Sequence, residues 1–147
     1  MRRLALLLAL CAALLFGCEG GTISNHSQSC TSTGGLLEGR TVTCSGEARS
    51  LGGSVGIEFG DADEEEEELS GTYRLTAEIS VQSGEARVYS YDAEGERLPL
   101  GTVSAGAPLR VTDTVIEPSG ESSVFFVDAG EEGRVEGLRY EGTIEPV

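Results

Sequence analysis

The chain has 147 residues, of which 25 are acidic and 10 are arginine, and with no lysine its formal net charge is −15 at pH 7. Such a surface offers no basic patch for phosphate groups, which excludes nucleic acid and anionic lipid headgroups as partners. The length allows one domain with a modest core.

The first residues have the pattern of a secretory signal. Met1-Arg2-Arg3 provides a positively charged start, and Leu4 to Phe16 contains only Leu, Ala, Cys and Phe. This apolar run is shorter than the stretch of about 20 residues that a helix needs to cross the hydrocarbon core of a membrane. A charged start followed by a short apolar segment is typical of a signal peptide. We therefore expect residues 1–17 to be removed from the mature protein.

The end of this segment reads Leu15-Phe16-Gly17-Cys18, which resembles the lipobox of bacterial lipoproteins. The resemblance implies that Cys18 receives a diacylglyceryl group, that the chain is cut before Cys18, and that the new amine is acylated, for example with palmitate. Cys11 is a poorer site because the bulky Leu10 precedes it. The alternative is an ordinary secretory signal with a chance cysteine.

Several acyl chains hold a protein stably at a membrane. We therefore expect a lipid-anchored protein of the cell envelope that faces the periplasm or the cell exterior. Glu19 follows the lipidated cysteine. In enteric bacteria an Asp at that place favours retention at the inner membrane, so Glu19 favours the outer membrane.

Residues 18–35 are predicted to form a flexible tether between the lipid and the folded domain. Glu19 to Ser29 consists mainly of Gly, Ser, Thr, Asn and Gln, a composition typical of flexible linkers. The only histidine of the chain, His26, lies in this tether. The folded domain is expected to occupy residues 36–147.

The folded domain shows the alternation of β-strands. In its clearest segment, Tyr73 to Val81, five apolar residues alternate with polar ones, which places one face on a core and the other in water. Ser83-Gly84 then predicts a tight turn into the next strand of a hairpin. The strands predicted along the chain lie around Val42–Cys44, Val55–Phe59, Tyr73–Val81, Glu85–Tyr91, Arg97–Val103, Leu109–Ile116, Val124–Val127 and Leu138–Ile144.

Short strands separated by Gly-rich turns, with no helical pattern after the signal, indicate an all-β fold. We predict a small antiparallel β-sandwich. Jelly-roll and immunoglobulin-like connections fit the pattern equally well. Val124-Phe125-Phe126-Val127 is apolar on both faces, so we expect this strand to be central.

Cys30 and Cys44 are the two cysteines that remain once Cys11 is removed and Cys18 is lipidated. In an oxidising compartment, two thiols of one small domain usually pair. We predict a structural disulfide, with free thiols as the alternative. The spacing is too wide for a Cys-x-x-Cys redox pair.

An acidic run contains Asp61, Asp63 and the five glutamates Glu64 to Glu68. One interpretation is a Ca²⁺ site at Asp61, Asp63 and Glu64, because Ca²⁺ takes several carboxylate oxygens at once. The favoured interpretation is a solvated loop between two strands, because the run lacks the residue order of a known calcium loop. A decoy for a basic partner is the third possibility. We expect no resident cofactor apart from this possible Ca²⁺.

Tyr89 and Tyr91 are candidates for ligand binding because they share one face of a predicted strand. An exposed pair of aromatic rings could stack on a sugar. The aromatic content is only 5% and there is no tryptophan, so packing in the core or at its rim is the favoured interpretation for both rings.

Catalysis has little support in the sequence. Nucleophilic hydrolysis needs a base beside Ser or Cys, and the only histidine lies in the predicted tether. We therefore predict a non-catalytic protein of the cell envelope that acts as a protein-interaction or accessory module. The first alternative is a polysaccharide-binding module, with or without Ca²⁺, and the second is a small hydrolase.

Overall fold

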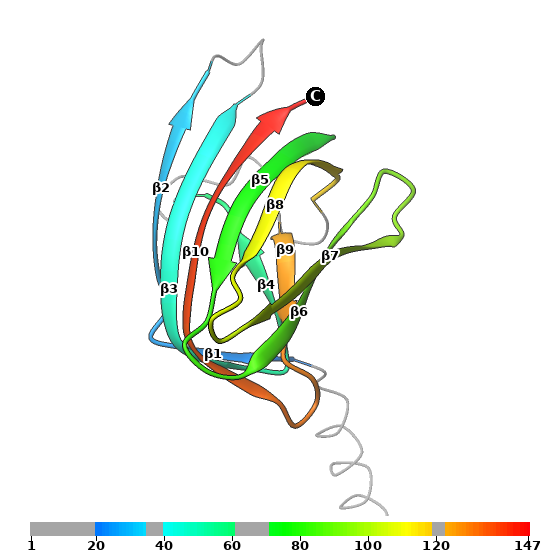
Figure 1. The fold of residues 1–147 in the computed structure, drawn as a ribbon. Coiled ribbons are helices and arrows are strands. Elements are labelled where there is room, and N and C mark those ends of the chain that lie inside the picture. Colours follow the sequence, from blue (N-terminus) through cyan, green and yellow to red (C-terminus); the bar gives the residue numbers. More distant parts are fainter. Residues whose placement is uncertain (1–19, 35–39, 61–70, 119–122) are drawn as a thin grey trace, which may run out of the picture.

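The computed structural model describes residues 20–34, 40–60, 71–118 and 123–147. These residues form strands, turns and extended connections (Figure 1). The described part of the chain has no helix that is long and apolar enough to cross a membrane. The strands are β1 (Thr22–Ser24), β2 (Ser27–Thr33), β3 (Thr41–Gly52), β4 (Ser54–Glu58), β5 (Tyr73–Ser80), β6 (Glu85–Tyr91), β7 (Arg97–Ser104), β8 (Leu109–Ile116), β9 (Ser123–Asp128) and β10 (Arg134–Pro146).

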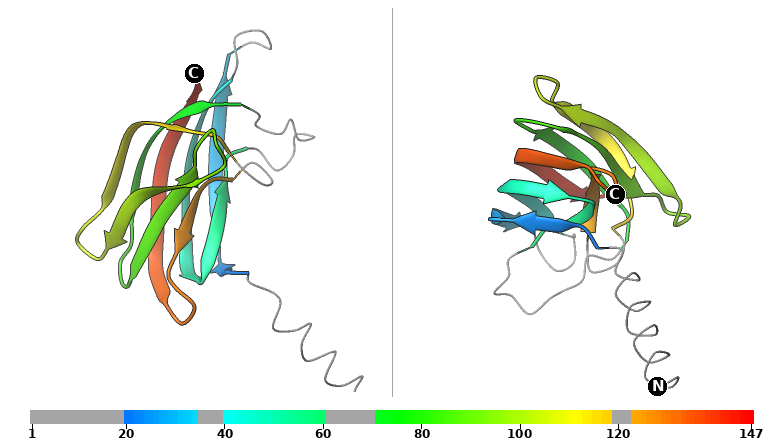
Figure 2. Two further views of the ribbon diagram at one scale, coloured as in Figure 1. Left: turned by 90° about the vertical axis from the view of Figure 1, so that its right-hand side faces the viewer. Right: turned by 90° about the horizontal axis from the view of Figure 1, so that it is seen from below.

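Two antiparallel sheets face each other (Figure 2). The six-stranded sheet has the order β1-β3-β10-β5-β8, and β2 also pairs with β3; the four-stranded sheet has the order β4-β9-β6-β7. The predicted all-β sandwich is confirmed.

The connections identify the sandwich as a jelly roll. Strand β3 pairs with β10, β4 with β9, β5 with β8, and β6 with β7. These nested pairs are those of one long hairpin that has been rolled into two sheets, which is the jelly-roll arrangement and not the immunoglobulin-like one.

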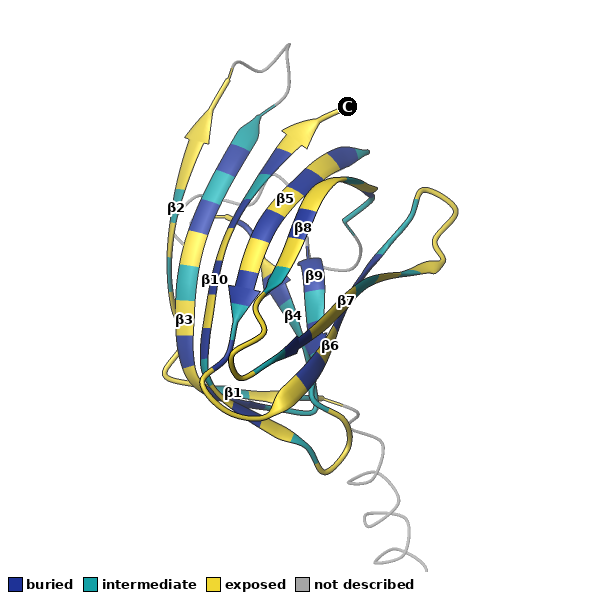
Figure 3. Cartoon of the chain, viewed as in Figure 1, coloured by how far each residue is buried: buried dark blue, intermediate teal, exposed yellow. Residues whose placement is uncertain are grey.

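The core lies between the sheets and follows the predicted alternation. In β5, Tyr73, Leu75, Ala77 and Ile79 are buried, whereas the polar residues between them are exposed or half-buried (Figure 3). Strand β9 lies between β4 and β6 as expected for a central strand, and its Phe125 is fully buried. Burial of this apolar surface is the main favourable term in folding.

The predicted flexible tether is wrong for residues 22–33. Residues 22–24 form β1, which pairs with residues 50–52 of β3. Residues 27–33 form β2, which pairs with residues 41–47 of β3. A strand needs backbone hydrogen bonds to a neighbour but few apolar side chains, so a Ser- and Thr-rich segment can join a sheet. The folded domain therefore starts well before residue 36. Cys18 and Glu19 lie outside the described residues.

Candidate functional site

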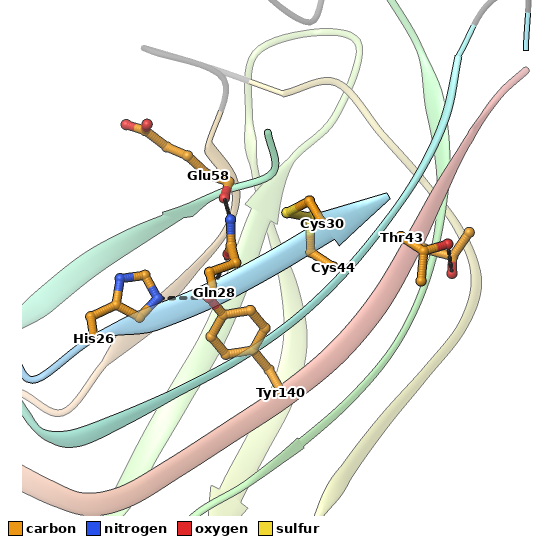
Figure 4. Close-up of a disulfide and its surroundings, with 8 residues drawn as sticks. His26, Gln28, Cys30, Thr43, Cys44, Glu58 and Tyr140 are labelled. Atoms are coloured by element: carbon orange, nitrogen blue, oxygen red, sulfur yellow. Dashed lines mark hydrogen bonds between the residues drawn. A yellow bond between two sulfur atoms is a disulfide. The ribbon is translucent and has the colours of Figure 1, made fainter. Parts of the chain in front are cut away.

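The predicted disulfide between Cys30 and Cys44 is confirmed (Figure 4). The two residues lie opposite each other in the register of β2 and β3. Cys44 is fully buried and Cys30 is half-buried. The bond thus joins the edge strand β2 covalently to the body of the sheet.

Hydrogen bonds made by side chains link both sheets beside the disulfide (Figure 4). His26 Nε2 lies 2.7 Å from the Tyr140 hydroxyl oxygen, and this hydroxyl donates to Gln28 Oε1. Gln28 Nε2 donates at 2.9 Å to the backbone carbonyl of Glu58, at the end of β4. Because Tyr140 gives its single proton to Gln28, His26 must donate its Nε2 proton to Tyr140. We name His26, Gln28 and Tyr140 the polar cluster.

Burial shifts the pKa values of the two titratable residues of the polar cluster, Tyr140 and His26. Tyr140 is only 3% exposed, and this burial raises the pKa of its phenol above the usual value. Partial burial of the imidazole lowers the pKa of His26. Gly46 makes room for the phenol, since a Cβ at this position would overlap the Tyr140 hydroxyl.

The structure corrects the expected position of His26. The residue lies between β1 and β2, where its imidazole donates to a buried phenol, and not in a flexible tether. This arrangement holds β2 against the core. It does not place the imidazole as a base beside a nucleophile, because the hydroxyl it contacts already donates to an amide oxygen.

Tyr89 and Tyr91 lie together on β6, but Tyr89 is not an open platform. Its ring stacks on Phe126 at a centroid distance of 5.0 Å, and the guanidinium carbon of Arg97 lies 4.0 Å from the ring centre. The Tyr89 hydroxyl bonds to Ser54 Oγ at 3.1 Å, and the residue is only 8% exposed. Tyr91 meets both rings edge-on and is half-buried. The favoured interpretation of packing at the rim thus fits both tyrosines.

The polar side of the six-stranded sheet contains a depression that no motif in the sequence indicates. It has a volume of 1070 Å³ and crosses β2, β3, β10, β5 and β8. The strand register aligns hydroxyl and charged side chains in rows across the sheet. The row Ser29, Ser45, Glu141, Glu78 and Arg110 lies wholly within the depression. In the neighbouring row, Thr143 and Thr76 line the depression, and Thr31 and Thr43 continue the row beyond it.

Neighbouring side chains in this depression and at its border interact across the strands. The hydroxyls of Thr43 and Thr143 lie 3.0 Å apart. Arg110 Nε lies 3.2 Å from Glu78 Oε2, and a second Arg–Glu pair lies nearby between β10 and β3. The polar residues that alternate with apolar ones in each strand predict a polar sheet face. The sequence alone does not show which of these polar residues become neighbours.

Several predicted site residues lie outside the described part of the chain. These are Cys18, the predicted lipidation site, and Asp61, Asp63 and Glu64, the possible Ca²⁺ ligands. Among the residues that the structure describes, no three His, Cys, Asp or Glu side chains gather as a metal site would require.

No family model and no curated protein sequence matches the chain. Among solved structures, it is similar to procruciferin, an 11S globulin from Brassica napus, with 16% identity and a TM-score of 0.33 over 72% of this chain. The coconut allergen cocosin has 14% identity and a TM-score of 0.35 over 87% of this chain. The capsular polysaccharide assembling protein CapF from Staphylococcus aureus has 9% identity and a TM-score of 0.33 over 82% of this chain. The chain spans only 22%, 27% and 29% of these three proteins.

Proposed function

We propose that this protein is a non-catalytic module of the bacterial cell envelope, anchored by lipid on Cys18, that acts in protein interaction or as an accessory protein. The observation that carries the proposal is the disulfide between Cys30 and Cys44. Disulfides form and persist in the periplasm and at cell surfaces. An oxidising location agrees with the lipobox-like sequence at residues 15–18.

The position of the only histidine supports a non-catalytic role. His26 donates to Tyr140 in the polar cluster and so contributes to the packing of β2. A binding protein needs a stable surface more than a reactive side chain, and the jelly roll presents polar sheet faces that meet this need.

The anchor is tested by expressing the full-length chain in bacteria supplied with an alkyne-tagged palmitate. We expect labelled protein in the membrane fraction. Cys18→Ala should abolish the label and release the protein from the membrane, whereas the matched control Cys11→Ala should change neither. Unlabelled wild-type protein, or label retained by the Cys18→Ala variant, would contradict the proposal.

The interaction role is tested by cross-linking in living cells. The wild-type chain should capture the same one or two envelope proteins in repeated experiments, and the mislocalised Cys18→Ala variant should not. Capture of nothing above background would count against an interaction module.

One observation favours polysaccharide binding as a second candidate. The depression on the six-stranded sheet presents rows of hydroxyl and charged side chains in one place, and such groups can form hydrogen bonds with sugar hydroxyls. Binding to an array of bacterial polysaccharides should be lost in Ser45→Arg, whose long side chain would occupy the depression, but not in Ser45→Ala. The effect of EDTA on binding tests whether Ca²⁺ takes part, for which Asp61, Asp63 and Glu64 are the candidate ligands.

A further inference from the structure

Strand β2 is held in place by specific bonds and not by burial. Its residues are exposed except for Gln28 and Cys30, which are half-buried (Figure 3). The strand lies at the border of the six-stranded sheet, next to β3 (Figure 1). It is fixed there by the disulfide to Cys44 and by the hydrogen bonds of Gln28 to Tyr140 and Glu58. These bonds hold β2 in place although its side chains contribute little to the core.

The geometry of the disulfide pair shows which backbone groups of β2 point outward. The Cα atoms of Cys30 and Cys44 are 4.1 Å apart. In antiparallel sheets, pairs without mutual hydrogen bonds are about 4.5 Å apart and hydrogen-bonded pairs about 5.5 Å. Cys30 therefore belongs to a pair without mutual hydrogen bonds, and its N–H and C=O point away from β3. The same holds for Gln28 and Ser32, two residues to either side.

These outward groups form a row that can pair with another strand. In the described part of the chain, no strand pairs with the outer side of β2. The three donors and three acceptors of Gln28, Cys30 and Ser32 match those that an added strand would use. The disulfide fixes the register of β2 against β3.

Strands β7 and β8, which end the two sheets, carry features that hinder strand addition, whereas β2 does not. Strand β7 contains Pro99, and its register with β6 shifts. Strand β8 contains Asp113 in the left-handed region, with φ of 44°, and its register with β5 also shifts. Proline, bulges and charges are the usual means by which proteins block edges. The sequence of β2 is SQSCTST, which has no proline, glycine or charge.

We propose that the outer edge of β2 takes up an extended basic segment of a partner protein as an additional strand. The inference deepens the interaction role proposed above and rests on it. The net charge of −15 attracts a segment with Lys or Arg side chains and repels a second copy of the same chain. The uncharged sequence of β2 allows the segment to approach, and the backbone of Gln28, Cys30 and Ser32 binds it.

The test uses the full-length chain, purified in detergent, and a phage-displayed library of random linear peptides. We expect enrichment of peptides with alternating basic residues whose affinity falls at high salt. Ser32→Pro removes one outward N–H without removing a hydrogen bond to β3, and should weaken peptide binding about tenfold. The matched control Ser32→Ala should bind as the wild type does. The backbone amides of Gln28, Cys30 and Ser32 should become protected from hydrogen exchange when peptide is bound.

Ser32→Lys is a second variant in case proline disturbs folding. It places a positive charge on the edge and should also weaken binding of a basic peptide, while the melting temperature reports folding. Equal binding by the wild type, Ser32→Pro and Ser32→Lys would overturn the proposal. Enrichment of acidic or uncharged peptides, no enrichment, or a dimer that Ser32→Pro abolishes would also overturn it. Palmitate labelling at Cys18 does not depend on β2, so failure at the edge is distinguishable from failure of the envelope role.

Discussion

Removal of the disulfide should destabilise the whole domain and release β2 first. The bond joins residues 14 apart in sequence, and in the chain-entropy model closure of a loop of about 15 residues contributes roughly 3 kcal/mol. Since β2 buries few side chains, it is otherwise attached to the sheet only by its backbone pairing with β3 and by the hydrogen bonds of the polar cluster. We expect the Cys30→Ala/Cys44→Ala double variant to lose about 3 kcal/mol of unfolding free energy.

Urea unfolding followed by circular dichroism measures this loss. With a slope of about 1–3 kcal/mol per M, the midpoint should fall by about 1–3 M. Wild-type protein reduced with dithiothreitol is the matched control, because it loses the bond but keeps both side chains. Hydrogen exchange should also show that the amides of Ser29 and Thr31, which belong to hydrogen-bonded pairs with β3, become less protected than those of β5.

A midpoint that stays within about 0.5 M of the wild type, with unchanged protection in β2, would refute this reasoning. It would mean that the backbone hydrogen bonds and the polar cluster suffice to hold the strand. A large loss in the double variant without a loss on reduction would point instead to the space left by the buried Cys44 side chain.

Three further predictions concern side chains outside the disulfide. Because the pKa of His26 is lowered in the folded protein, the unfolded chain binds a proton at this imidazole more readily than the folded chain does. This residue therefore lowers the free energy of unfolding as the pH falls below about 6.5. NMR titration of the single imidazole should give a midpoint below about 6.5. Gly46→Ala should cost about 1–3 kcal/mol in thermal unfolding, because the new Cβ would overlap the Tyr140 hydroxyl. Arg97→Gln should cost about 0.5–1 kcal/mol by loss of the cation over the Tyr89 ring, and no change in urea midpoint would contradict that contact.

The polar face of the six-stranded sheet shows how far alternation predicts a surface. Alternation in β5 correctly indicates that Thr76 and Glu78 face solvent. It does not show that Glu78 meets Arg110 of β8, or that Thr76 continues a row from Thr143 of β10. Those neighbours depend on the register of strands that are distant in sequence, so the depression was not predicted.

The tyrosines of β6 also show that alternation within one strand does not predict contacts with other strands. Alternation places Tyr89 and Tyr91 on one face, and the structure agrees. The residues that cover the Tyr89 ring, Phe126 and Arg97, come from two other strands. With these contacts Tyr89 is only 8% exposed, and no local pattern in β6 could reveal this.

Sequence by itself determined the all-β class and the buried face of a regularly alternating strand such as β5, because side-chain alternation is a local property of each strand. It also identified Cys30 and Cys44 as partners, because the expected maturation leaves no other thiols. Only the tertiary structure decided between a jelly roll and an immunoglobulin-like sandwich, and only it placed residues 22–33 in the sheet. These features depend on contacts between distant segments, such as that of Gln28 with Tyr140. A strand that is held by backbone bonds, a disulfide and one amide side chain leaves no apolar pattern in its own sequence.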